Sequence, residues 1–209
     1  FTGGSDALGE AALAAWADGR GRWPTVDWQR HAMRGIVGIV DDPWNAAQYP
    51  MVVDVKKGHA ALFGASGYGK STFLRALILG LAGSHSPNEF QAHILDLGGR
   101  TLEVLRALPH VGTVVMPDER GYEERVQQLW REMNDLIETR KRLFTEAGVS
   151  TLYEYNRSGQ PVEPALLIAI DNFGEYIETF GNQTAEDSPM EVLTTLMRQS
   201  RAYGIHFVI

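Results

Sequence analysis

The sequence predicts an α/β fold in which a mainly parallel sheet carries helices on both faces. Apolar runs of strand length alternate along the chain with segments of helical periodicity. Two of these runs, 60–63 and 165–170, are apolar without alternation, which is typical of strands buried on both faces. The chain has 209 residues, of which 44% are hydrophobic, and this is enough for one sizeable core.

The elements follow one another in a regular order. We expect two short strands, at 35–40 and 51–55, separated by a turn-rich Asp41-Asp42-Pro43. The later strands are expected at 60–63, 90–97, 111–116, 165–170 and 205–209, and the helices at 71–81, 121–147 and 190–203. The long helix carries one apolar stripe, made of Val126, Trp130, Met133, Ile137 and Phe144.

The chain divides into a lead-in or linker at 1–34 and one domain at 35–209. A short helix at 7–17 is the main pattern in the first part, and a Gly/Arg-rich break with Pro24 follows it. The last strand reaches the final residue, so we expect the domain to be incomplete at its C-terminal edge.

Composition narrows the function. A net charge of −7 argues against a broadly basic nucleic-acid surface. There are no cysteines, which excludes disulfides and thiolate chemistry, and the six histidines show no metal-ligand spacing. No apolar run approaches the roughly 18 residues of a membrane helix, so any membrane attachment is expected in other parts of a larger protein.

One motif carries the most chemistry. The pattern G-x-x-x-x-G-K-[ST] lies between a predicted strand and a predicted helix, the context of a phosphate-binding P-loop. Its residues are Gly64, Ala65, Ser66, Gly67, Tyr68, Gly69, Lys70 and Ser71. The glycines let backbone N–H groups point at phosphate oxygens, Lys70 reaches the β- and γ-phosphates, and Ser71 ligates Mg²⁺. We expect Thr72 at the α-phosphate, and ATP with Mg²⁺ as the ligands; the alternative is a glycine-rich turn with an exposed lysine.

A second acid is expected at the end of a neighbouring strand. Asp171 follows the apolar run 165–170 and is predicted to hold Mg²⁺ through water, with a helix cap as the alternative. Hydrolysing P-loop enzymes usually carry Glu at the next position, where this chain has Asn172. An amide cannot accept a proton from water, so ATP is expected to bind but to turn over slowly or only with a partner subunit. Glu175 is a weak candidate to replace that base.

Several segments resemble the motor domain of FtsK/SpoIIIE-type ATPases over about residues 51–209. They are the P-loop with its strand and helix, Ile94 to Gly99, Leu108 to Val111, Arg131 to Met133, Arg140 to Phe144, Ala147 to Val149, Tyr155-Asn156, the strand ending at Asp171, and Arg201 to His206. The resemblance implies a RecA-like P-loop NTPase core for the domain at 35–209.

Within that family the chain looks most like the EccC/EssC ATPases of type VII secretion. Gly38 to Pro43, Asp96 to Gly99 and Leu108 to Gly112 carry this resemblance, whereas DNA translocases typically have Asp-Pro-Lys and Asp-Glu where this chain has Asp96-Leu97-Gly98 and Asp171-Asn172. It implies a cytoplasmic module of a bacterial cell-membrane protein, with tandem ATPase modules, a possible hexameric ring and the signal sequence of a secreted protein as partners. A DNA-translocating FtsK-type domain is the alternative function, and a structural adaptor with permanently bound nucleotide is a third.

Other polar residues have two readings each. Arg198 and Arg201 either reach the γ-phosphate of a neighbouring subunit or are surface arginines paired with Glu on the same helix. Asp96 either contacts a Mg²⁺-bound water or closes the turn at Gly98-Gly99. We expect His110 to be a hydrogen-bonded core histidine, and Arg140-Lys141-Arg142 to be a solvated helix face rather than a DNA contact.

Overall fold

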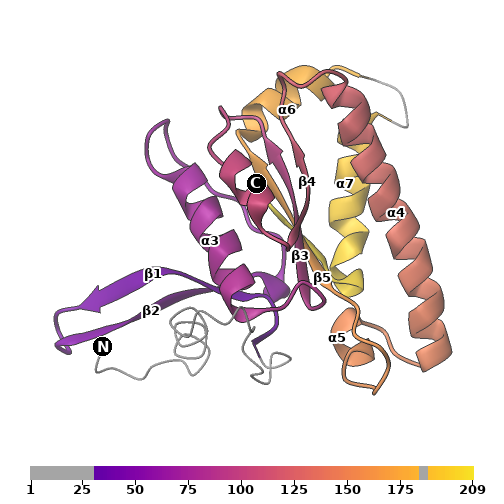
Figure 1. Ribbon diagram of the computed structural model, residues 1–209, viewed down its shortest axis with the longest axis horizontal. Helices are drawn as coiled ribbons and strands as arrows, with labels where there is room; N and C mark the ends of the chain where they lie inside the picture. The colour runs from indigo at the N-terminus through magenta and orange to yellow at the C-terminus, as the bar shows by residue number, and fades with distance from the viewer. Residues whose placement is uncertain (1–30, 184–187) are drawn as a thin grey trace.

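Figure 1 shows the computed structural model, which describes residues 31–183 and 188–209. The predicted helix at 7–17 and most of the lead-in lie outside the described residues. Ala32 and Met33, at the end of the lead-in, are buried in the hydrophobic core. The core packing therefore begins just before the first strand.

The centre of the fold is a four-stranded parallel sheet. Its strands are β3 (Phe90–Asp96), β4 (Val111–Val115), β5 (Ala165–Asp171) and β6 (Ile205–Val208), in the order β4-β3-β5-β6. All three strand pairings are parallel, and the register places Asp96 opposite Asp171. The predicted parallel sheet is confirmed, and the carboxyl ends of β3 and β5 lie side by side.

Helices cover both faces of this sheet. Helix α3 (Lys70–Ser84) lies on one face, whereas α4 (Tyr122–Ala147) and α7 (Pro189–Gln199) lie on the other (Figure 1). Alternate side chains of β5 pack on opposite faces. Leu167 and Ala169 belong to the core cluster of α3, and their neighbours belong to the cluster of α4, α6 (Phe173–Phe180) and α7. The helices on both faces are as the alternation of elements predicted.

Several short helices were not predicted. Helix α6 (Phe173–Phe180) follows β5 after a single residue, and α5 (Leu152–Tyr155) follows α4. Short 3₁₀ helices lie at Val55–Lys57, Glu103–Ala107 and Ser200–Tyr203. The last of these takes up the end of the predicted helix at 190–203. Elements of one or two turns show too little periodicity to be recognised from sequence.

The prediction of a fully buried strand at 60–63 is wrong. Ala60 forms an isolated parallel bridge with Val208, and the N–H groups of Ala60 and Leu62 donate to the carbonyls of Phe207 and Ile209. The segment thus lies beside β6 at the edge of the sheet. Among the described residues, it pairs with β6 on one side and with no strand on the other. Phe63 is 94% exposed. Apolar composition predicts an extended segment but does not say whether neighbours cover it.

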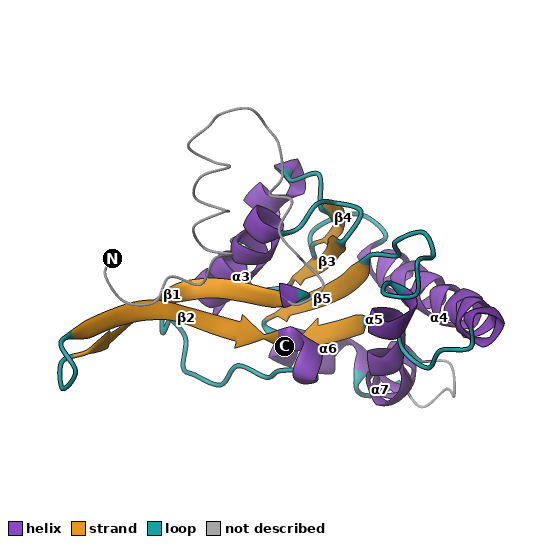
Figure 2. Cartoon of the chain, turned by 90° about the horizontal axis from the view of Figure 1, so that it is seen from below, coloured by secondary structure: helices purple, strands orange, loops and turns teal. Residues whose placement is uncertain are grey.

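The first two strands form an antiparallel hairpin of β1 (Arg34–Asp42) and β2 (Ala47–Asp54). The hairpin extends beyond the end of the parallel sheet (Figure 2). Its base packs against α3 at very short range, since a Cβ atom on Gly80 would lie 2.3 Å from the carbonyl oxygen of Ile36. Gly80 is therefore needed where helix and strand backbones meet.

The predicted stripe of α4 is buried as expected, but it contains two further residues, Leu129 and the charged Arg140. The guanidinium of Arg140 donates to the carbonyls of Tyr203 and Pro164 and lies 3.6 Å from the carboxylate of Glu163. Burial lowers the pKa of Arg140 to about 10, while Glu163 opposes the shift, so the side chain stays charged at neutral pH.

The predicted solvated face at 140–142 is thus wrong for its first residue. Arg140 follows Ile137 by three residues and precedes Phe144 by four, which places it on the apolar stripe. Helical phase, rather than the charge of the run, decides its burial. The neighbouring Arg142 is exposed.

We expect Arg140→Met to lower the free energy of unfolding by about 2 kcal/mol, because two partly buried carbonyls would lose their donors. Removal of a buried charge offsets part of this loss. Arg142→Met is the matched control and should change stability by less than about 0.5 kcal/mol. Urea unfolding monitored by circular dichroism measures both. Equal stability of the two variants would contradict a structural role for Arg140.

Candidate functional site

The P-loop forms a tight turn between the edge segment and α3. Gly67 and Gly69 have φ angles of +81° and +84°, a backbone region that favours glycine. Helix α3 begins at Lys70, and its first backbone hydrogen bond runs from Phe73 N–H to the carbonyl of Gly69, at 2.8 Å. The N–H groups of the first turn therefore precede the intrahelical ladder, as in an anion-binding helix N-terminus.

The ammonium group of Lys70 lies inside this turn. Its Nζ donates to the carbonyl oxygens of Gly64 at 2.7 Å and Ala65 at 2.9 Å. The Tyr68 side chain, at the tip of the turn, is 83% exposed and does not enclose the lysine. The lysine is thus held at the loop by neutral acceptors, which an anionic ligand with stronger acceptors would replace.

The strand ends bring an acid to the start of α3. Ser71 Oγ donates to Asp171 Oδ2 at 2.6 Å, across 100 residues of sequence. The backbone N–H of Asn172 donates to Asp171 Oδ1 at 3.1 Å. The N-cap position of α6 belongs to Asn172, so the helix-cap alternative for Asp171 is wrong.

Two clefts flank the P-loop. The larger, with a volume of about 490 Å³, lies between the P-loop and the ends of β3 and β5, and its walls include Gly67, Ser71, Thr72, Thr101 and Asp171. The smaller, of about 320 Å³, is bordered by the edge segment and the start of α6. Lys70, Asp171 and Asn172 border both.

The few metal-binding side chains at this site suit a Mg²⁺ ion that is coordinated mainly by phosphate oxygens and water. Within residues 31–183 and 188–209, no three His, Asp or Glu side chains gather as a metal cluster. Mg²⁺ keeps several waters and typically uses one or two carboxylates together with substrate phosphates. Ser71 and Asp171, with phosphate oxygens in the 490 Å³ cleft, fit that pattern.

Asn172 occupies a constrained position. Its φ of +58° is left-handed, a conformation that Asn adopts more readily than most residues, and its Nδ2 donates to the Leu97 carbonyl at 3.3 Å. Glu175, by contrast, lies in the first turn of α6 and borders neither cleft. Its charge acts on Tyr122, whose pKa is raised chiefly by burial. The structure does not bring Glu175 to the phosphate side.

Asp96 closes the loop that follows β3. Its carboxylate is buried, and Oδ2 accepts the backbone N–H of Leu102 at 2.8 Å. Burial raises the pKa of Asp96, and the nearby charge of Asp171 adds to the shift while the Leu102 N–H opposes it. Of the two readings of Asp96, this geometry favours the closing of the turn.

The remaining predicted residues lie away from the clefts. His110 is buried, with Nε2 hydrogen-bonded to the His85 carbonyl at 2.8 Å, so it is a core histidine as expected. Arg198 and Arg201 are exposed, and Arg201 donates to the Lys57 carbonyl at 3.4 Å. Neither arginine forms a salt bridge within the described part of the chain, so the expected pairing with Glu on α7 is wrong.

The loop after β3 contributes Thr101, a wall residue that the sequence did not single out. Thr101 Oγ1 donates to Asp171 Oδ2 at 3.3 Å, and a Cβ atom on Gly98 would lie 2.9 Å from the same oxygen. The pair Gly98-Gly99 directly after a strand was a signal of close backbone approach. It did not indicate which side chain would be approached.

The comparisons with known proteins agree with one another on the family. The family model of the FtsK/SpoIIIE family matches residues 25–209. The ESX secretion system protein EccC of Thermomonospora curvata is 35% identical over 189 residues, which are 88% of this chain and 14% of that protein. The type VII secretion system protein EssC of Staphylococcus aureus is 30% identical over 179 residues, 83% of this chain and 11% of that protein.

A solved structure agrees with these matches. It contains ATPases 2 and 3 of Thermomonospora curvata EccC in complex with a signal sequence peptide. The TM-score is 0.72 at 30% identity, over 88% of this chain and 33% of that one. The chain thus spans a small part of the proteins that it matches. Among the helices of the described residues, none has the length and apolar character needed to cross a membrane.

Proposed function

The chain belongs to the FtsK/SpoIIIE family, which implies nucleotide binding, and on that premise we propose that it is an ATP-binding module of a type VII secretion ATPase. ATP with Mg²⁺ is the proposed ligand pair. The phosphates would lie in the 490 Å³ cleft against Gly67, Lys70 and the N-terminus of α3. Ser71 would ligate Mg²⁺, and Asp171 would hold it through water.

The observation that carries the proposal is the Ser71–Asp171 hydrogen bond of 2.6 Å between two residues that line this cleft. It joins the two groups that a P-loop site needs on its metal side, from segments 100 residues apart. A glycine-rich turn with a merely exposed lysine would not require an acid at this place. The RecA-like arrangement of the parallel sheet supports the same function.

We further propose that intrinsic hydrolysis is weak. Among the described residues that border the two clefts, Asp171 is the sole carboxylate, and it already accepts hydrogen bonds from Ser71 and Thr101. A carboxylate assigned to the metal is not free to take a proton from the attacking water. Asn172 borders both clefts but has no basic oxygen that could replace it.

The proposed partners follow from the relatives. One EccC structure contains a signal sequence peptide, and we propose that this chain also takes part in recognising the signal of a secreted protein. The same proposal includes neighbouring ATPase modules, assembly into a hexameric ring, a cytoplasmic location and membrane attachment through other parts of a larger protein. Arg198 and Arg201 are exposed and would be available to a neighbouring module.

The test compares ATP binding with ATP turnover. We expect the chain to bind a fluorescent ATP analogue in Mg²⁺, with turnover well below one per second and no stimulation by duplex DNA, since typical enzyme turnover is about 1–1,000 per second. Fast, DNA-stimulated turnover would instead support a translocase of the FtsK kind. Absence of ATP binding would refute the nucleotide site.

A further inference from the structure

The loop at 97–102 is fixed at both ends beside the phosphate cleft. At its start, the Leu97 N–H donates to the Asp171 carbonyl at 3.3 Å. At its end, the Leu102 N–H donates to the buried carboxylate of Asp96 at 2.8 Å, and the Leu102 side chain is buried in the core. Because both ends are anchored to β3 and β5, the residues between them have a defined place over Asp171.

The inner side of the loop touches the metal-side acid directly. Thr101 Oγ1 donates to Asp171 Oδ2, the same oxygen that accepts from Ser71. Gly98 approaches this oxygen so closely that a Cβ atom there would lie at 2.9 Å. Oδ2 is thus held between two hydroxyl donors, one from the P-loop helix and one from the loop opposite.

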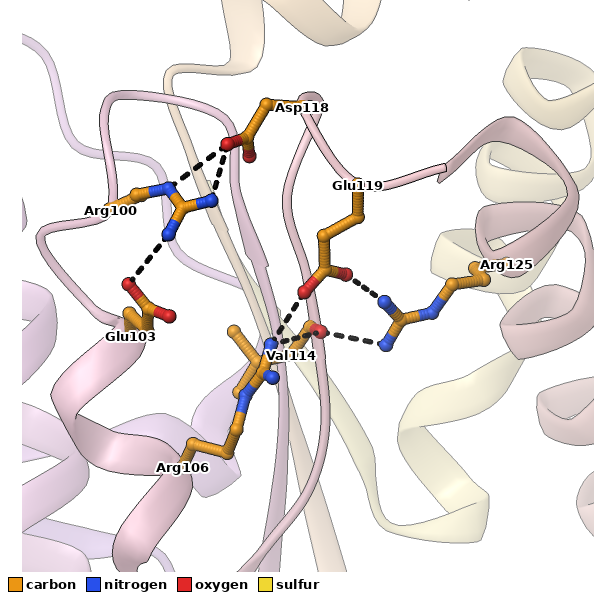
Figure 3. A network of polar contacts seen from close by, with 7 residues as sticks. All are labelled: Arg100, Glu103, Arg106, Val114, Asp118, Glu119 and Arg125. Atoms are coloured by element: carbon orange, nitrogen blue, oxygen red, sulfur yellow. Dashed lines mark hydrogen bonds and ion pairs between the residues drawn. The ribbon is translucent and has the colours of Figure 1, made fainter. Parts of the chain in front are cut away.

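The outer side of the loop is held by ion pairs (Figure 3). Arg100 has a left-handed backbone, with φ +63°, and its guanidinium binds Asp118 and Glu103. The next acid, Glu119, binds Arg106 and Arg125. The Arg100–Asp118 pair ties the loop to the segment between β4 and α4, and the Arg106–Glu119 pair ties the short helix after the loop to the same segment. The loop is therefore supported from outside the cleft.

We propose that Thr101 is a positioning residue that sets the orientation of the Asp171 carboxylate for Mg²⁺-bound water. A carboxylate has about four acceptor sites. Two on Oδ2 are taken by Ser71 and Thr101, and one on Oδ1 by the Asn172 N–H. One site on Oδ1 remains for a metal-bound water, and the Thr101 hydroxyl keeps the carboxylate from turning away from it. This inference rests on the proposed ATP and Mg²⁺ site.

The test uses Thr101→Val, which keeps the shape of the side chain but removes the hydroxyl, and Thr101→Ser, which keeps the hydroxyl. Affinity for a fluorescent ATP analogue is measured in EDTA and across a Mg²⁺ titration, with melting temperatures of the ligand-free proteins. We expect Thr101→Val to weaken the apparent Mg²⁺ affinity about tenfold, because outer contacts of metal ligands typically have effects of this size. Its ATP affinity in EDTA should not change, and Thr101→Ser should behave as the parent chain.

Three results would overturn the role of Thr101. The first is a parental Mg²⁺ dependence in Thr101→Val. The second is an equal loss in both variants, which would assign the effect to loop shape rather than to the hydroxyl. The third is an equal loss of ATP affinity with and without Mg²⁺. If the parent chain itself binds no ATP, the proposed function fails together with this inference; in all three earlier results the parent still binds, and only Thr101 loses its role.

Discussion

Replacing Lys70 with alanine is expected to weaken ATP binding about a hundredfold. In the proposed complex the ammonium makes charge-assisted hydrogen bonds to two phosphates, each worth about 1.5 kcal/mol or more. Two such bonds sum to about 3 kcal/mol, which is about a hundredfold in dissociation constant. Titration with a fluorescent ATP analogue in Mg²⁺ measures the change.

The ligand-free structure makes this variant a clean test. Lys70 binds only the exposed carbonyls of Gly64 and Ala65, which water can satisfy after the substitution, so unfolding should change by less than about 1 kcal/mol. Lys141→Ala removes the same charge from α4, where Lys141 pairs with Glu138 away from both clefts. An affinity of Lys70→Ala equal to that of Lys141→Ala would refute the P-loop assignment.

Long periodic elements were the part of the fold that sequence predicted well. The 26 residues of α4 show their stripe over several turns, and β3 and β5 appear as apolar runs. The errors concern what lies around an element. Phe63 is exposed because the edge segment is covered on one side, and Arg140 is buried because acceptors from Tyr203 and Pro164 meet it there. The local sequence pattern does not predict either environment.

The candidate site also contains features that the sequence predicts and features that it does not. In a parallel sheet the carboxyl ends of strands meet at one edge, so the juxtaposition of the P-loop helix and Asp171 follows from topology. The contact of Thr101 with Asp171 does not, because it depends on how the six-residue loop at 97–102 folds back over β5. The left-handed backbone of Asn172 was also beyond prediction, although Asn is among the residues that tolerate it.

The second large effect is expected for Asn172→Glu, and the left-handed backbone at this position limits it. A carboxylate at this place would border both clefts and could accept the proton of an attacking water, a contribution of about 10²–10⁴ in rate. A glutamate with positive φ costs about 1–2 kcal/mol, and the hydrogen bond to the Leu97 carbonyl would be lost. We therefore expect a gain in ATP turnover of at least about tenfold, which is below the lower end of that range.

Asn172→Gln is the matched control, because it has the length and the backbone strain of glutamate but no basic oxygen. Turnover should rise in Asn172→Glu alone, while both variants keep similar ATP affinity. Both are measured as isolated chains and at concentrations that favour assembly, since an arginine from a neighbour can supply charge that one chain lacks. Equal, unchanged rates for both variants in the assembled state would show that the missing base does not limit hydrolysis. The limit would then lie in what a neighbour contributes, and Arg198 and Arg201 would be the next residues to replace.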